Sequence, residues 1–254
     1  MAEADYVSVK QAAESLGLDD SRVRQLLREG RLRGAVIGSR WIVETEAVRE
    51  RKTSAHTPGR PLSERNAWGI LALLSGSRPP ALSDPERSRL MARIRDLADY
   101  EELPAERLRK LLAARAEVRR YRAHRGLLPT LLADPDVVRT GVSAAPRVGA
   151  DYVAPGRAEI YVHPDRVGKL EAGFGLVLDA HGGNLVVRVP SATAWTFLVS
   201  AEWDEREGRD APAPVVAADL LDTGEDRAVA AAAGVLQPLL VANAANAAKG
   251  RRAS

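Results

Sequence analysis

The residues best suited to do chemistry lie in a short arginine-rich stretch near the N-terminus. Between Ser21 and Arg40 the sequence holds six arginines and one acidic residue. Guanidinium groups bind phosphate oxygens and the acceptor edge of guanine, and a glutamine such as Gln25 can pair with adenine in the major groove. The chemistry that this stretch offers is therefore the recognition of DNA.

A predicted helix from about Ser21 to Glu29 positions most of these side chains. Its inner face is apolar, because Val23, Leu26 and Leu27 recur at helical spacing. Gly30 follows as a natural C-terminal stop. Pointing away from the apolar face are the polar residues Arg22, Arg24, Gln25 and Arg28.

A β-hairpin is predicted directly after this helix. Two extended segments, Arg33–Ile37 and Arg40–Val43, are joined by Gly38-Ser39 at hairpin spacing. The tip of such a hairpin can lie along the DNA backbone or enter the minor groove. A last short helix is predicted over Glu44–Lys52.

An earlier helix completes the predicted N-terminal unit. Ser8 and Gln11 form a capping box, in which hydroxyl and amide satisfy free N–H groups at a helix start, and Gly17 ends that helix. Two helices, a tight turn and a hairpin together predict a winged helix-turn-helix over residues 1–52.

The stretch SVKQAAESLGLDDSRVRQLLREGRLRGAVIGSRWIV resembles the DNA-binding domain of the excisionase and MerR families. The matching pieces are V-x-x-A-A-x-x-L-G, S-R-V-R-Q-L-L-R-E-G and G-x-R-W-x-V, and the resemblance covers about a fifth of the chain. It implies groove contacts from the second helix, including Ser21, and wing contacts from the hairpin, with Trp41 packing beneath the wing. The full set of predicted DNA-binding residues is Ser21, Arg22, Arg24, Gln25, Arg28, Arg33, Ser39 and Arg40.

Signals of other chemistry are missing from the sequence. It contains no cysteine, which excludes a disulfide scaffold, a thiolate zinc site and a cysteine nucleophile. No phosphate-loop, dinucleotide-binding, nucleophile-elbow or zinc-protease motif is present. The histidines are scattered, and Asp179 with His181 fits a hairpin turn better than a catalytic pair. We therefore expect no enzyme activity, no cofactor and no metal site.

The remainder of the chain predicts an α+β protein. Segment 62–135 is expected to be helical and to include a helix with an arginine-rich face from Arg107 to Arg125. Short strands are expected at 137–138, 152–153, 159–162, 175–179 and 184–189, with helices at 215–221 and 226–240, the latter ended or kinked by Pro238. The predicted order is a winged helix-turn-helix at 1–52, a Pro- and Gly-rich linker at 53–61, a helical region at 62–135, a mixed α/β domain at 136–242, with an exposed connection at 204–214, and a flexible tail at 243–254.

Charge is distributed unevenly. Residues 1–125 carry a net charge of +7 and residues 126–254 a net charge of −4. This asymmetry suggests that the front half meets a polyanion and that the back half does not. No apolar run reaches 18 residues and the N-terminus lacks the pattern of a secretory signal. We expect a cytoplasmic protein with no membrane partner.

A second resemblance covers most of residues 60–240. Val142-Ser143-Ala144-Ala145, the segment NLVVRVP at 184–190, and ADLL at 218–221 with Asp226-Arg227 resemble the C-terminal part of AbiEi-type antitoxins of type IV abortive-infection systems. Many of these antitoxins begin with a different winged helix. The resemblance implies a non-enzymatic antitoxin domain at 136–242 that counteracts a nucleotidyltransferase toxin without needing to bind it. It also implies an N-terminal domain that represses its own promoter at inverted repeats, and hence two copies of the chain, a homodimer, on DNA.

Three hypotheses follow for the function. The first is this antitoxin and autorepressor. The alternative is a stand-alone transcription regulator of the MerR or excisionase kind, whose C-terminal half senses a ligand or dimerises. A recombination accessory factor is weaker, because excisionases are usually much shorter than 254 residues.

Overall fold

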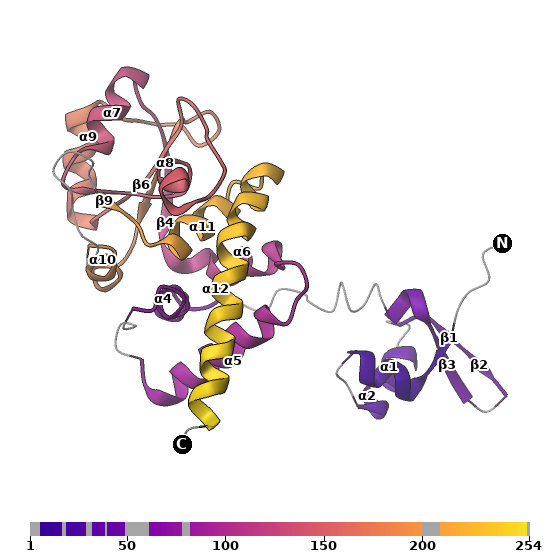
Figure 1. Cartoon of the computed structure of the whole chain (residues 1–254). Coiled ribbons are helices and arrows are strands. Elements are labelled where there is room, and N and C mark those ends of the chain that lie inside the picture. Colours follow the sequence, from indigo (N-terminus) through magenta and orange to yellow (C-terminus); the bar gives the residue numbers. More distant parts are fainter. Residues whose placement is uncertain are drawn as a thin grey trace. The chain divides into compact units, whose positions relative to one another are not determined.

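The chain divides into two compact units, residues 1–59 and residues 60–254, each with its own hydrophobic core. Figure 1 shows the computed structural model with the first unit in indigo. The expected linker, apart from Pro61, falls outside the residues that the structure describes, as do Ser39 and the first part of the expected connection at 204–214. The described residues are 6–16, 19–28, 32–38, 40–48, 61–77, 82–199 and 209–252.

The first unit packs two helices on a small antiparallel sheet. Its strands pair in the order β1-β3-β2, and the sheet covers a core built from Ala12, Val23, Leu26 and Val43, which are all fully buried. Residues 45–48 are helical. The elements are β1 (Tyr6–Ser8), α1 (Val9–Leu16), α2 (Asp20–Arg28), β2 (Gly34–Ile37) and β3 (Arg40–Glu44).

Local signals account for most of this unit. The predicted capping box is present, since the Ser8 N–H donates to Gln11 Oε1 at 2.9 Å and the Gln11 N–H donates to Ser8 Oγ at 3.2 Å. Gly34 lies so close to β3 that a Cβ atom there would be 2.3 Å from the Ile42 carbonyl oxygen. Gly38 adopts a φ of +64° at the hairpin tip, where a side chain would be strained. The sequence did not predict β1, which has only three residues.

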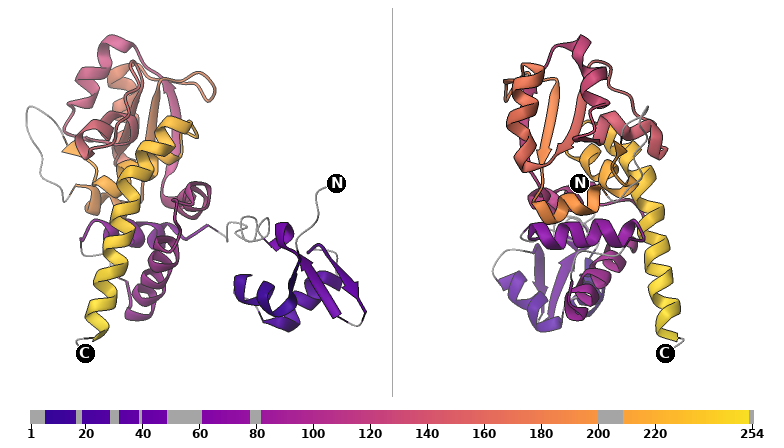
Figure 2. Two further views of the ribbon diagram at one scale, coloured as in Figure 1. Left: turned by 45° about the vertical axis from the view of Figure 1, so that its right-hand side comes forward. Right: turned by 90° about the vertical axis from the view of Figure 1, so that its left-hand side faces the viewer.

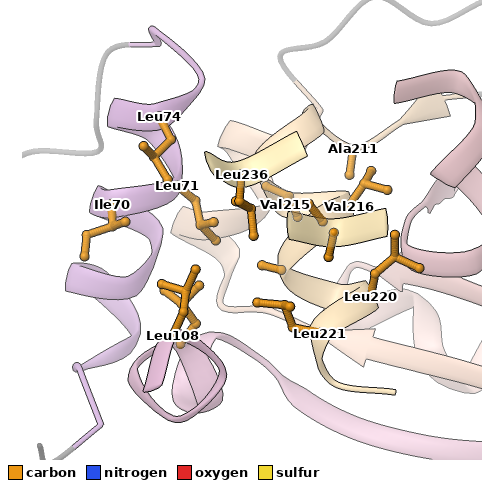
Figure 3. Close-up of a cluster of buried hydrophobic side chains, with 14 of the residues drawn as sticks. Ile70, Leu71, Leu74, Leu108, Ala211, Val215, Val216, Leu220, Leu221 and Leu236 are labelled. Carbon is orange, nitrogen blue, oxygen red and sulfur yellow. The ribbon is translucent and has the colours of Figure 1, made fainter. Parts of the chain in front are cut away.

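The helices of the second unit enclose the larger core. Figure 3 shows side chains of α4, α6, α11 and α12 meeting there, and α4 is buried continuously from residue 67 to residue 74. Trp68 on α4 makes edge-on contacts with Tyr161 and Phe197, with ring centroids 5.7 and 5.9 Å apart. The long helices are α4 (Glu64–Leu74), α5 (Asp84–Ala98), α6 (Ala105–Leu112), α11 (Ala213–Leu221) and α12 (Asp226–Arg252).

A mixed sheet of six strands lies beside these helices, in the order β7-β4-β8-β6-β5-β9. The pairs β6–β8 and β5–β9 are parallel and the others antiparallel. Figures 1 and 2 show the sheet between helices, and the cores place α7 and α9 on one face with α8 and α11 on the other. The strands are β4 (Glu117–Arg122), β5 (Val137–Arg139), β6 (Ala158–Val162), β7 (Val177–Leu178), β8 (Leu185–Val189) and β9 (Arg209–Asp210).

Short helices connect these strands. They are α7 (Leu128–Leu132), α8 (Gly141–Ala144), α9 (Val167–Phe174) and α10 (Ala192–Leu198), with 3-10 turns at Ala113–Arg115, Arg125–Leu127, Ala145–Val148 and Pro164–Arg166. The fold is therefore α+β, as predicted, although α8, α9, α10 and β9 were missed. The expected strand at 152–153 is wrong, since these residues form no regular element; the Tyr152 hydroxyl instead donates to Glu225.

The expected arginine-rich helix over Arg107–Arg125 is also wrong. Helix α6 ends at Leu112, a 3-10 turn carries the chain to Arg115, and β4 begins at Glu117. Strand β4 pairs with β8, with Glu117 opposite Val189 and Tyr121 opposite Leu185. Partners about 70 residues away in the chain therefore decide the structure of this segment, and its local charge pattern does not reveal them.

Helix α12 is longer than predicted. It continues through Pro238 to Arg252, so residues 243–252, expected to form a flexible tail, are helical. Pro238 and Gly234 are both exposed and lie one turn apart, so the Gly234 carbonyl that loses its partner to proline can bond to water. Among the described residues, Asp226–Asn246 is long and apolar enough to cross a membrane. Its inward face, with Ala228, Ala232, Leu236 and Leu240, belongs to the core of the second unit.

A buried ionic cluster joins the helices of the second unit to its sheet. Asp219 on α11 is fully buried. Its Oδ1 accepts hydrogen bonds from Arg115 Nε and the Tyr161 hydroxyl, each at 3.0 Å, and its Oδ2 accepts one from the Thr140 hydroxyl. Arg188 Nε on β8 lies 3.3 Å from the same Oδ1. Four elements of the unit thus converge on one carboxylate.

Arg115 and Arg188 extend this cluster. Arg115 Nη1 donates to the Leu112 carbonyl at 2.9 Å, and the Arg115 carbonyl accepts from Trp68 Nε1 at 2.7 Å. Both arginines also reach Asp222, and Arg188 Nη1 donates to its Oδ2 at 2.8 Å. These contacts connect α4, α6, β8 and the end of α11.

Glu159 lies at the edge of the cluster, where fewer groups neutralise its charge. It is only 3% exposed, its nearest cation is Arg188 at 3.6 Å, and its buried Oε2 receives no hydrogen bond among the described residues. Burial raises the pKa of this carboxyl to about 7. A Cβ at Gly141 would lie 2.0 Å from Oε2, so glycine is required beside it.

Replacing Asp219 by alanine should lower the free energy of unfolding by about 3–5 kcal/mol, because Arg115 and Arg188 would stay buried without the carboxylate that they share. Urea denaturation followed by tryptophan fluorescence measures this loss. Asp96→Ala, an exposed carboxylate on α5, is the matched control and should cost less than about 0.5 kcal/mol. Equal losses in the two variants would contradict the structural role of Asp219.

Glu159 should make the stability of the protein depend on pH. Between the ordinary pKa of 4.5 and about 7, the folded protein keeps a proton that the unfolded chain has released. The free energy of unfolding therefore falls as pH rises through this window, by up to about 3 kcal/mol. Glu159→Gln cannot ionise, so its stability relative to the wild type should improve from pH 5 to pH 8.

The exposed Glu102→Gln variant provides the control for this pH series. Its stability difference from the wild type should stay constant over the same range. A Glu159→Gln difference that is also constant with pH would show that Glu159 does not titrate in this window.

Candidate nucleic-acid interface

The start of α2 is held by a charged cap. Asp19 Oδ1 accepts a hydrogen bond from the backbone N–H of Arg22 at 2.8 Å and another from the Ser21 hydroxyl. The bonds from Ser21 and Arg22 keep the pKa of the Asp19 carboxyl below its usual range, so it is an anion at the positive end of the helix. Ser21 therefore helps to hold the capping carboxylate of Asp19, and its contact with DNA stays a prediction.

Helix α2 has the two faces that the sequence predicts. Val23, Leu26 and Leu27 are buried in the core of the first unit. All members of the polar set on the other side are exposed; they are Arg22, Arg24, Gln25 and Arg28. The helix thus presents guanidinium groups and an amide to the solvent from a rigid support.

Neighbouring side chains order this polar face. Arg22 Nη1 donates to Gln25 Oε1 at 2.7 Å, Arg24 lies 3.6 Å from Asp20 one turn earlier, and Arg28 Nε donates to the Arg24 carbonyl. Exposed contacts of this kind contribute only a few tenths of a kcal/mol. A phosphate or a base edge can therefore replace them at little cost.

The hairpin brings further predicted residues onto the same unit. Arg40 is exposed at the start of β3, and Trp41 packs against the core of the unit, as the family resemblance implies. Arg33 Nε lies 3.0 Å from Glu44 Oε2 at the foot of the hairpin. Arg33 thus helps to fix the wing, in addition to any contact with phosphate.

Sequence reasoning missed several residues of this surface. Asp19 and Asp20 were not singled out, although an aspartate before an apolar periodic segment is an ordinary helix-start signal. The apolar residues Val36 and Ile37 beside the hairpin tip are 52% and 66% exposed. No local pattern distinguishes such exposed strand residues from buried ones, because both lie in an apolar run.

The positive charge is more local than the balance of the two halves suggests. Residues 1–52 contain 10 basic and 9 acidic residues, so the excess of residues 1–125 comes mainly from residues 53–125. On the first unit six of the arginines lie between Ser21 and Arg40, where Glu29 is the one acidic residue. Within this unit the positive charge therefore gathers on the exposed side of α2 and on the wing, although Asp20 on α2 and Glu44 on β3 are acidic.

Residues considered for other chemistry have roles in turns. His124 and His163 each accept a backbone N–H two residues on, with Nδ1 as acceptor at 3.2 Å. Asp179 accepts from the Gly182 N–H at 2.9 Å and from Arg122, which lowers its pKa. Within the described ranges, no group of three or more histidine or acidic side chains could hold a metal; the absence of catalysis and of cofactors stays a prediction.

A helix-turn-helix domain family matches residues 6–55, which include α1, α2 and the β2–β3 hairpin. No curated protein and no solved structure matches the chain significantly. The protein therefore carries an N-terminal helix-turn-helix domain, and a domain of this kind implies DNA binding.

Substitutions on this surface should separate sequence reading from general affinity. Gln25→Ala should weaken binding to the preferred sequence by about 1–3 kcal/mol and change binding to random DNA little, because it removes a base contact. Arg40→Ala should weaken binding to both about equally, because it removes a phosphate contact. Fluorescence anisotropy with a duplex selected from a random library, and with a scrambled duplex, measures both. Equal losses for Gln25→Ala on the two duplexes would exclude base reading by Gln25.

Proposed function

We propose that this protein is a DNA-binding autorepressor and the antitoxin of a type IV-like toxin–antitoxin pair. The helix-turn-helix match at residues 6–55, together with the exposed arginine and glutamine face of α2, carries the DNA-binding half. The antitoxin half is supported by the resemblance of the second unit to AbiEi-type antitoxins. The proposal places the protein in the cytoplasm with its operator and needs neither a catalytic group nor a cofactor.

The DNA-binding half has a simple mechanism. Helix α2 enters the major groove, where Arg24 and Gln25 meet base edges, while Arg40 and the rest of the wing meet the backbone. One such domain buries a modest interface and gives limited specificity. Two copies on an inverted repeat provide the affinity that repression requires.

The antitoxin half rests on segments around the buried ionic cluster. The pieces that carry the resemblance lie on α8, β8 and α11, and they include Arg188 and Asp219. The resemblance in these pieces is what supports a common fold for the second unit. Its action on a nucleotidyltransferase toxin is then carried over from the resemblance, and it needs no direct contact with the toxin.

A stand-alone regulator with a ligand-sensing second unit is the second candidate. The observation that favours it is a pocket of about 450 Å³ in the second unit, lined largely by cationic side chains. A regulator of this kind does not require a toxin encoded by the adjacent gene, whereas an antitoxin does.

Two readouts in one host test the proposal. If it holds, expression of the reading frame next to this gene should stop growth, and co-expression of this chain should restore it. A reporter fused to the chain's own upstream DNA should be repressed. The Arg24→Ala/Gln25→Ala variant should lose repression and keep protection, because it alters only the DNA-binding face. The exposed control variant Arg87→Ala on α5 should keep both.

The two halves of the proposal can fail separately. The antitoxin half would be overturned if the product of the adjacent reading frame is harmless when expressed alone, or if it stays toxic when this chain is co-expressed. The protein would then be a transcription regulator only. A reporter that is not repressed would overturn autorepression.

A further inference from the structure

A cationic pocket opens on the second unit next to the buried cluster. Its volume is about 450 Å³. Three stretches of the chain form it: residues 109–120 on α6 and β4, Arg188 on β8, and Asp222 at the end of α11. The side chains that matter for its chemistry are Arg109, Lys110, Val118, Arg120, Arg188 and Asp222.

Positive charge remains at the rim of this pocket after its ion pairs are considered. Arg109 and Lys110 share one carboxylate, Glu106, at 2.7 and 3.1 Å. Arg120 on β4 is exposed, and within the part of the chain that the structure describes no side chain pairs with it. The rim therefore has three cations for one carboxylate, Glu106, while Asp222 in the lining is already paired with the buried Arg115 and Arg188.

The floor of the pocket is rigid. Arg188 is only 3% exposed, and its Nη1 donates to Asp222 Oδ2 at 2.8 Å. Its Nε lacks a well-formed hydrogen bond among the described residues, although Asp219 lies 3.3 Å away. Because the buried cluster fixes this guanidinium, a ligand that reaches the floor does not have to order it.

We propose that this pocket binds the phosphate groups of a small phosphorylated molecule. An oxyanion with several charged oxygens can accept charge-assisted hydrogen bonds from Arg120, Lys110 and Arg109 together. The volume is within the range of ligand pockets. Val118, which is 44% exposed, supplies an apolar wall for the part of the ligand that is not phosphate.

The surroundings of the pocket favour a small ligand over a nucleic-acid backbone. Binding to a duplex requires cations that follow a row of phosphates. Here the cations converge on one pocket, the carboxylate of Asp222 is part of its lining, and Arg109 and Lys110 pair with Glu106 on α6. The inference concerns the second unit alone and does not depend on the antitoxin proposal.

Isothermal titration of the full chain with inorganic pyrophosphate, ATP and adenosine tests this site. The buffer should be free of divalent cations and low in salt. Pyrophosphate and ATP should bind at one site per chain, and adenosine should not bind. Arg120→Ala should weaken ATP binding at least about tenfold, since it removes a charge-assisted contact. Arg87→Ala, an exposed arginine outside the pocket, should leave it unchanged.

Three results would overturn the proposal. The first is no binding of pyrophosphate or ATP at millimolar concentration. The second is an equal loss in Arg120→Ala and Arg87→Ala, which would indicate diffuse charge attraction only. The third is an Arg120→Ala variant that loses affinity for a DNA duplex while its ATP binding is unchanged, which would assign the cations to a DNA footprint. Thermal melting of both variants should match the wild type, because both side chains are exposed.

Discussion

Asp219 has no exposed surface, and its carboxylate oxygens accept hydrogen bonds from Arg115, Thr140 and Tyr161, which lie on three separate segments of the second unit. Burying this charge is costly unless each partner is in place, so the positions of α11, β6 and the turn after α6 depend on one another. Apolar packing alone would tolerate small shifts between helices and sheet. The ionic cluster accepts one arrangement, and that arrangement also fixes Arg188 at the floor of the cationic pocket.

The first unit follows a different principle. Its core is small and wholly apolar, and its polar side chains are held by exposed contacts that are individually weak. Weak contacts suit a surface that must exchange its partners for phosphates and bases. The second unit thus contains a buried and fixed ionic cluster, whereas the described arginine side chains of α2 and the wing are exposed.

Prediction from sequence succeeded where the signal is local. The Ser8–Gln11 capping box, the apolar face of α2 and the glycine turn of the hairpin each depend on residues within a few positions of one another, and each is present. The misassigned helix over Arg107–Arg125 shows the limit. Arg115 in that segment is buried against Asp219, which lies 104 residues later in the chain. Because the partner is so distant, no local pattern separates this arginine from a solvent-exposed one. The cap formed by Asp19 and Ser21 is also local and was not predicted, whereas the pairing of Arg33 with Glu44 depends on the fold of the hairpin.

In the proposed mode of binding, the exposed cations of α2 and the wing contact DNA phosphates as well as bases. The most direct test measures the affinity of the full chain for a selected duplex across a series of salt concentrations. The logarithm of the binding constant should fall linearly with the logarithm of salt concentration, with a slope of about −0.9 for each phosphate neutralised. An affinity that does not change with salt would exclude binding through phosphates.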